Sequence, residues 1–121
     1  MSDYQTPPGK TTIAHQVLLT IASLAALQVP GVSRLSIVPG QSVNRLLHPD
    51  QLVEGVHIEV KDDAVFADLY VVLNHDVNAR EVGREIQHEV ARAISEMVGL
   101  NVGKIDVHIE DIDYPGETEA A

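Results

Sequence analysis

The sequence predicts an α+β fold in which two helices pack on one face of a small mixed β-sheet, as two layers in the order α-β-β-β-α-β. Between residues 82 and 98, apolar side chains recur at steps of three and four, which places them on one face of a helix. Residues 56–73 and 105–112 instead alternate apolar and polar side chains, as strands with one buried face do. Neither kind of element can bury its apolar side alone, so the helices and the sheet must cover each other.

The length and composition fit a single folded domain. The chain has 121 residues, of which 45% are apolar, and this is enough for one core but not for two. We expect the domain to span residues 11–112, between a flexible arm at residues 1–10 and an acidic tail at residues 113–121. The chain has no cysteine, which excludes disulfides and thiolate chemistry.

The charge and the apolar pattern restrict where the protein acts. A formal net charge of −10 repels nucleic-acid phosphates and anionic lipids, and a single Phe with no Trp offers no stacking platform for single strands. The first twelve residues lack the basic start and apolar stretch of a signal peptide. No run approaches the roughly 20 apolar residues that span a bilayer. We therefore expect a cytoplasmic protein that binds no nucleic acid and does not insert into a membrane.

The first helix is expected to begin with Thr11 or Thr12 as its N-cap and to stop at Pro30, where Gly31 turns the chain into a strand at residues 32–38. Its apolar stripe follows helical spacing through Ile13, Val17, Ile21, Leu24 and Leu27. A second set of small and apolar residues widens this stripe, namely Leu18, Ala22, Ala25 and Ala26. A helix that is apolar over much of its circumference suits the core of the domain, with part of its surface left for another subunit.

A hairpin follows, with its turn at Asp62 and Asp63, because aspartate tolerates turn conformations. This turn pairs Val60 with Val65, Ile58 with Ala67 and Val56 with Leu69, and it sets His57 opposite Asp68 and Glu59 opposite Phe66 on the other face. Both helices are expected to cover the apolar sheet face, which is formed by Val56, Ile58, Val60, Val65, Ala67, Leu69, Val71, Ile105, Val107 and Ile109.

The second helix is expected to begin at Asn78, whose spacing from Glu81 is that of a capping box. It ends at Gly99, because glycine tolerates the left-handed conformation that closes many helices. Gly83 lies beside the apolar stripe, and a close approach to the sheet is one reason for a glycine there. The final strand covers residues 105–112.

No catalytic motif is complete, so we expect no enzyme and no cofactor. His88 and Glu89 imitate the start of a zinc-protease helix motif, but Arg92 takes the place of the second histidine, and its cation would repel the metal. The chain also lacks a glycine-rich phosphate loop and a nucleophile elbow. An alternative function is a divalent metal or small ligand held on the non-core sheet face by His57, Asp68 and His108. The competing interpretation of these side chains is a solvated face with cross-strand pairs.

Three features are candidates for contact with a protein partner. Phe66, Tyr70 and Val72 share the non-core sheet face with charges, which indicates cover by the long loop or by a second subunit. The loop at residues 39–54 has no clear period, and its Leu46 and Leu47 are either a docking hook or cover for local surface. The exposed face of the second helix carries three charge pairs at spacing i, i+3, namely Glu81–Arg84, Glu85–His88 and Glu89–Arg92. This face either pairs its own charges or presents a basic stripe to an acidic partner, formed by Arg80, Arg84, His88 and Arg92.

The pattern as a whole resembles the alkaline shock protein family of bacterial envelope-stress proteins, over residues 12–113. The apolar first helix ends in a Gly-Val pair at residues 31 and 32, and residues 68–72 match the alternating strand that ends the family's hairpin. The strongest match is the second helix with the final strand, at residues 82–112. The chain departs from the family at residues 74 and 75, which are Asn-His where members often carry Tyr-Gly.

The resemblance implies a function without catalysis. Members of this family are small cytoplasmic proteins linked to cell-envelope stress and the general stress response. Some are held near the membrane by a small membrane-anchored partner and form larger assemblies. No catalytic residue can be transferred from the family. The resemblance therefore implies an interaction module whose partners are other copies of itself and a small membrane-anchored protein, at the inner face of the cell membrane.

Overall fold

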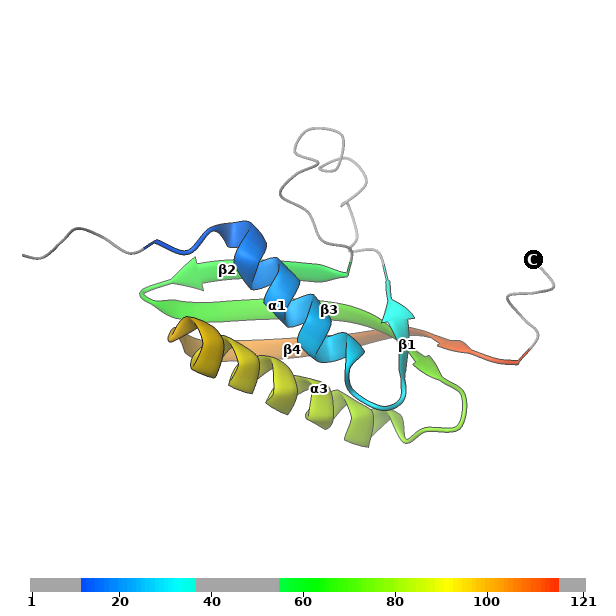
Figure 1. The fold of residues 1–121 in the computed structure, drawn as a ribbon. Coiled ribbons are helices and arrows are strands. Elements are labelled where there is room, and N and C mark those ends of the chain that lie inside the picture. The colour runs from blue at the N-terminus through cyan, green and yellow to red at the C-terminus, as the bar shows by residue number, and fades with distance from the viewer. Residues whose placement is uncertain (1–11, 37–54, 116–121) are drawn as a thin grey trace, which may run out of the picture.

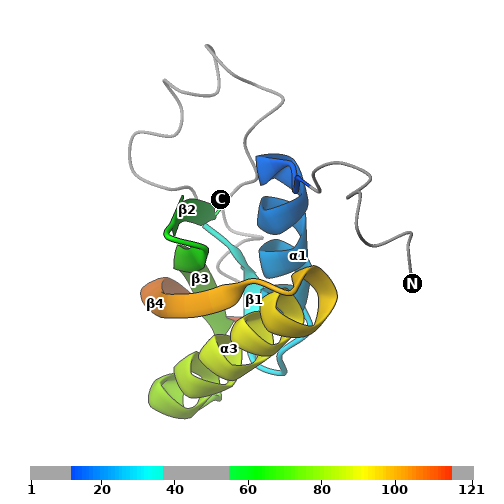
Figure 2. The ribbon, with the colours of Figure 1, turned by 90° about the vertical axis from the view of Figure 1, so that its left-hand side faces the viewer.

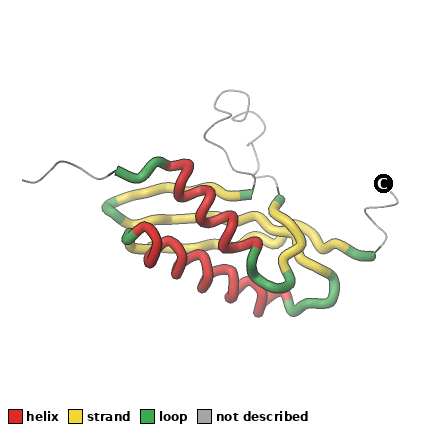
Figure 3. The backbone as a smooth tube through the Cα atoms, viewed as in Figure 1, coloured by secondary structure: helices red, strands yellow, loops and turns green. Residues whose placement is uncertain are grey.

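The computed structural model describes residues 12–36 and 55–115, and its layers are shown in Figures 1 and 3. The described residues form helices and strands in the predicted order α-β-β-β-α-β, with a short π-helical turn, η3, after the second helix. In chain order the elements are α1 (His15–Leu27), β1 (Val32–Leu35), β2 (Val56–Lys61), β3 (Ala64–Asn74), α3 (Ala79–Ala93), η3 (Ile94–Val98) and β4 (Asn101–Asp113).

The sheet is built around β3, which pairs with all three other strands. β4 runs parallel to β3 along its whole length, from Ala64 to Asn74. β2 and β1 are both antiparallel to β3, at residues 64–69 and 71–73 respectively. Because β4 occupies one edge completely, β2 and β1 lie end to end along the other edge. The sheet is therefore mixed, as predicted.

The hairpin has the predicted turn and register. Asp62 and Asp63 have φ values of 52° and 63°, the left-handed conformation that two-residue hairpin turns need at both central positions. The Cα partners include every predicted pair: Val60 with Val65, Ile58 with Ala67, Val56 with Leu69, His57 with Asp68 and Glu59 with Phe66. This register sends the apolar set of β2 and β3 to one face of the sheet and the polar set to the other.

β1 and β2 meet beside Tyr70 in the middle of β3. The backbone N–H of Ser36 donates to the carbonyl of Tyr70 (2.7 Å), and the N–H of Tyr70 donates to the carbonyl of Gly55 (2.8 Å). Gly55 has a φ of +82°, and a side chain there would come within 2.6 Å of the Cβ of Leu35. Ser36 and Gly55, the described residues before and after the gap at 37–54, are thus hydrogen-bonded to one residue of β3. The predicted loop at 39–54, with Leu46 and Leu47, lies outside the described residues.

Both helices lie on the same face of the sheet, as Figure 2 shows end-on. The core between the helices and the sheet contains seven of the ten predicted strand residues and adds Leu73, which is fully buried; the seven are Val56, Ile58, Val65, Ala67, Leu69, Val71 and Ile105. Within residues 12–36 and 55–115, no helix has the length and apolar character that crossing a bilayer requires. The largest side chains without exposed surface in this core are Leu69, Leu73, Ile86, Ile94, Val65, Val71 and Val90.

One prediction for α1 is wrong and another is right only in part. The helix begins at His15, and its N-cap, Ala14, has no side chain that could accept a hydrogen bond, so Thr12 does not cap it. Of the predicted stripe, Val17, Leu24 and Leu27 point outward and are 45–55% exposed, whereas Leu18, Ala22 and Ala26, which the prediction added to widen the stripe, are buried. The residues that pack on the sheet are Leu18, Leu19, Ala22, Ser23 and Ala26. Because α1 is apolar over much of its circumference, its periodicity did not identify the inner face, and the small alanines allow the closer approach.

The inner sheet face is the predicted one, but it is not covered to its ends. Val60 of β2 is 46% exposed and Ile109 of β4 is 38% exposed, although both were predicted to be buried. Val60 pairs with Val65 in the register, so the two side chains lie on the same face of the sheet. Val65 is fully buried and Val60 is not, so the two positions differ in how far other residues cover them. The two helices therefore shield the centre of this face and leave two of its corners exposed.

The ends of α3 follow the predicted capping. The side chain of Asn78 accepts a hydrogen bond from the N–H of Glu81 (3.1 Å), and Gly99 ends the helical segment with a φ of 80°. The reason predicted for Gly83 is wrong, because a Cβ built at this position has nothing within 4 Å. No neighbouring element therefore packs closely against the helix at Gly83.

Replacing Gly83 by alanine should raise the free energy of unfolding by roughly 0.5–1 kcal/mol, because alanine is the better helix former and the site is open. The matched control is Gly99→Ala, which also has open space around it but sits at a positive φ, and it should lower the free energy of unfolding by roughly 1 kcal/mol. Urea denaturation of the three proteins measures both changes, and a destabilising Gly83→Ala would contradict the assignment of an open helical site.

Candidate functional site

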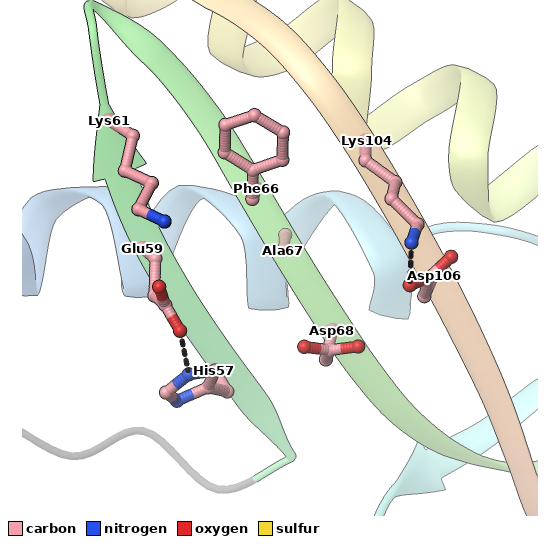
Figure 4. A pocket seen from close by; sticks show the side chains of 8 residues that line it. All are labelled: His57, Glu59, Lys61, Phe66, Ala67, Asp68, Lys104 and Asp106. Atoms are coloured by element: carbon pink, nitrogen blue, oxygen red, sulfur yellow. Dashed lines mark hydrogen bonds and ion pairs between the residues drawn. The ribbon is translucent and has the colours of Figure 1, made fainter.

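The sheet face that points away from both helices, here called the outer face, carries most of the predicted site residues. β3 contributes Phe66, Asp68 and Tyr70 by alternation, and its neighbours in register contribute His57 and His108. Figure 4 shows the side chains at one end of this face projecting from β2, β3 and β4, with the helices behind the sheet. The outer face therefore joins residues from three strands on one surface.

A shallow hollow of about 290 Å³ lies on the outer face, across β3. The Phe66 ring lies against Gly103 of β4, where a Cβ would come within 2.5 Å of the ring. Gly103 has no partner in the β3 register, because the pairing shifts by one residue between Val102 and Lys104. The hollow is lined by His57, Glu59, Lys61, Phe66, Ala67, Asp68, Lys104 and Asp106.

Charged side chains on each side of the hollow are paired within their own strand. On β2, Nε2 of His57 lies 3.3 Å from a carboxylate oxygen of Glu59. On β4, the ammonium of Lys104 lies 3.4 Å from a carboxylate oxygen of Asp106. All four side chains are between 43% and 65% exposed, so each pair contributes at most about 1 kcal/mol. The rim of the hollow is thus a wet, mixed-charge surface.

The centre of the outer face is a contact between Asp68, Tyr70 and His108. The imidazole of His108 is hydrogen-bonded to the carboxylate of Asp68 (3.0 Å) and stacks on the Tyr70 ring, with centroids 4.5 Å apart and planes inclined by 13°. Burial raises the pKa of the Tyr70 hydroxyl, and the carboxylates of Asp68 and Glu110 raise it further because they oppose a second negative charge. Tyr70 is therefore held by the stack on one side of its ring, and its hydroxyl stays neutral.

The far end of the outer face is closed by contacts across β3. The Ser33 hydroxyl and the Arg34 guanidinium, both on β1, donate to the carboxylate of Asp113 at the end of β4, with Arg34 at 3.3 Å to each oxygen. These donors lower the pKa of the Asp113 carboxyl, the Ser33 hydrogen bond most. Val72, which lies next to Arg34 in the register, is only 1% exposed. The predicted partner contact through Val72 is therefore wrong for this conformation, because its side chain is covered.

The predicted metal-binding residues are only partly brought together. Asp68 and His108 are hydrogen-bonded, but His57, although opposite Asp68 in the register, bonds to Glu59 instead. In the part of the chain that the structure describes, no group of three or more His, Asp or Glu side chains is arranged to hold a metal ion. The geometry thus adds no support to the alternative function.

The basic stripe of α3 lies on the helical layer, away from the outer face. Arg84, His88 and Arg92 are exposed. Of the three predicted pairs at spacing i, i+3, the ion pair between Glu89 and Arg92 forms, at 3.1 Å. The other two, Glu81 with Arg84 and Glu85 with His88, are not among the ion pairs of the described residues. The predicted partner-binding residues therefore belong to two separate surfaces.

Sequence reasoning missed Lys61 and Lys104, which flank Phe66 on the outer face. Lys61 continues the alternation of His57 and Glu59 and could have been placed from the hairpin alone. Lys104 could not, because its position depends on the irregular pairing at Gly103.

The fold and the outer face together define a small α+β domain with two helices on one sheet face and an open, mixed-charge surface on the other. Comparison with known families agrees with this description. The chain belongs to the alkaline shock protein family, which has a cell envelope-related function, and the family model matches residues 3–114.

Two bacterial relatives are similar over most of their length. The uncharacterized protein YqhY of Bacillus subtilis (strain 168) is 27% identical over 114 residues, which cover 94% of this chain and 84% of YqhY. The uncharacterized protein Spy1535 of Streptococcus pyogenes serotype M6 is 30% identical over 105 residues, which cover 86% of this chain and 79% of Spy1535.

Among solved structures, the chain is similar in fold to the MamM CTD. Its copper form aligns with a TM-score of 0.56 and 15% identity, over 80% of this chain and 85% of that chain. A second structure of the same domain aligns with a TM-score of 0.50 and 15% identity, over 81% of this chain and 99% of that chain. At this identity the likeness concerns the fold alone.

The environment of Tyr70 predicts an alkaline loss of stability. Its pKa in the folded chain is raised above the ordinary value of 10.0, so at high pH the unfolded chain loses this proton first. The stabilisation is fully present below about pH 10 and is lost as pH rises through the folded pKa. Replacing Tyr70 by phenylalanine removes this contribution. The free energy of unfolding of the wild type should therefore begin to fall, relative to that of Tyr70→Phe, near pH 10 and should keep falling as pH rises toward the folded pKa.

Urea titrations at several pH values measure this difference. Between about pH 7 and pH 9 the free energies of unfolding of the two proteins should differ by a constant amount, which serves as the internal control. If this difference in free energy does not change up to about pH 11, Tyr70 is not held neutral by its neighbours.

Proposed function

We propose that this protein is a non-catalytic interaction module of bacterial cell-envelope homeostasis and stress response. It works by binding other proteins: further copies of itself and a small membrane-anchored protein. This proposal extends the envelope-related function of the family to a mode of action. In this view the protein is cytoplasmic and lies at the inner face of the cell membrane only through its anchored partner.

The observation that carries the proposal is the exposure of Phe66 on a sheet face that neither helix covers. Its side chain is 37% exposed and lies over a hollow whose rim carries both signs of charge. An aromatic anchor surrounded by polar groups is the usual composition of the energetic centre of a protein interface. Lys61 and Lys104 beside the ring favour a partner segment that brings carboxylates to an apolar side chain.

The rigidity of the outer face also favours binding. The stack of Tyr70 on His108 and the contact of His108 with Asp68 hold these side chains before any partner arrives. A surface that is already ordered pays less conformational entropy when it is covered. The residues that line the hollow include no Ser, Thr or Cys, so they offer no hydroxyl or thiol that a neighbouring histidine could activate as a nucleophile.

Replacing Phe66 by serine should weaken capture of the membrane-anchored partner by about tenfold, the loss expected for an interface anchor. The measurement is cross-linking in the host cell, followed by recovery of the tagged chain from the membrane fraction and identification of the adduct. The wild type should recover a small membrane-anchored protein, and Phe66→Ser should recover about a tenth as much.

The matched control is Ile109→Ser, because Ile109 has almost the same exposure, 38%, and lies on the other face of the sheet. This variant should recover the partner as the wild type does. Equal recovery by Phe66→Ser and the wild type, with both chains folded by circular dichroism, would rule out the outer face as the docking surface.

A further inference from the structure

The outward side of α1 is a largely apolar surface that no other described element packs against. Val17, Leu24 and Leu27 are 45%, 55% and 45% exposed, and Ile13 just before the helix is 39% exposed. Their spacing of three, four and seven residues puts them on one side of the helix. The inward side is already filled by Leu18, Leu19, Ala22 and Ala26. The exposed set is therefore a second apolar face rather than a frayed part of the core.

This surface has a projection and a hollow next to each other. A hollow of about 160 Å³ lies between α1 and the end of the second helical segment, and it is lined by Ile21, Leu24, Ala25, Gln28, Ala93 and Met97. Met97 on η3 is 71% exposed, the highest value among the exposed large apolar side chains of the described residues. The lining contains no charged side chain. A projecting Met97 or Leu24 could fill such a hollow on a neighbouring molecule.

The charge distribution indicates what this neighbour is. None of the 18 Asp and Glu residues of the chain lies between residues 12 and 36, although the net charge is −10. A basic partner finds no carboxylate on α1 to pair with. A bilayer is also a poor partner, since α1 lacks the Lys and Arg residues that hold interfacial helices on lipid. A second copy can bring its own uncharged α1 here and keep the carboxylates of the two molecules apart.

We propose that two copies of the chain pack α1 against α1 around a two-fold axis, each placing its Leu24 and Met97 toward the hollow of the other. A two-fold contact uses the same patch on both molecules, as a surface with its own projection and hollow allows. This inference rests on the self-association in the proposed function and assigns it to α1. It leaves the outer sheet face free for the other partner.

The size of the patch sets the strength of the dimer. A helix of this length is about 20 Å long and about 10 Å across, so α1 offers roughly 200 Å² in projection. Stable interfaces bury about 800 Å² of accessible surface on each partner. A patch of this size is small for an interface, so we expect the dimer to be weak and reversible.

Sedimentation velocity of the full chain, from about 1 to 300 µM, tests the proposal. The wild type should shift from monomer to dimer over this range. Leu24→Glu should raise the dissociation constant at least tenfold, because it buries a carboxylate in the contact, whereas Phe66→Ser should leave it within twofold.

A cross-linking experiment gives a positive readout, since the chain has no cysteine of its own. A short bismaleimide should link Leu24→Cys into dimers faster than it links Ile109→Cys.

Four results would overturn the α1 dimer. A wild-type dimer that Phe66→Ser disrupts and Leu24→Glu does not would move self-association to the outer face and leave the proposed function standing. Equal linking of the two cysteine variants would show that Leu24 does not lie at a contact between copies. A wild type that remains monomeric at 300 µM would remove self-association altogether, and capture of the anchored partner would then decide the proposed function alone. Binding of the monomer to phosphatidylglycerol vesicles, abolished by Leu24→Glu, would assign the α1 face to lipid.

Discussion

The arrangement of the whole domain depends on the pairing of β3 on both of its edges. β4 follows one edge from Ala64 to Asn74, while β2 and β1 share the other. Side chains of β3 alternate between the two faces, so the same ladder that turns Leu69 toward the helices turns Tyr70 toward the outer face. A slip of one residue would exchange the two sets and remove the core and the site together. Stability and binding surface therefore rest on one register.

Two irregularities in β4 adapt this register to the chemistry of the outer face. At Gly103 the extra residue carries no side chain, which gives the Phe66 ring a place to lie and brings Lys104 beside it. At the second shift, Glu110 is left without a partner and Asp111 is opposite Val72. Asp113 then ends the strand within reach of the donors on β1. Bulges of this kind re-aim side chains at the sites where strands carry function.

The domain presents two surfaces of different character. The outer face combines an exposed aromatic ring with charges of both signs, whereas the outward side of α1 is uncharged and apolar. The helices and the sheet separate these surfaces, so that a contact on one need not obstruct the other (Figure 2). Under the proposed function, two such surfaces would let the chain join copies of itself while it holds a different protein.

The sequence alone determined the elements whose signals are local. Asn78, Gly99 and the strict periodicity of α3 defined that helix, and the paired aspartates at 62 and 63 defined the hairpin and its register. Tertiary structure decided the rest. α1 is apolar over much of its circumference, so only packing against the sheet selected Leu18 and Ala22 over Val17 and Leu24 as its inner face. Likewise, His108 bonds to Asp68 because a bulged, parallel β4 lies beside β3, and a contact between residues 40 apart leaves no local pattern.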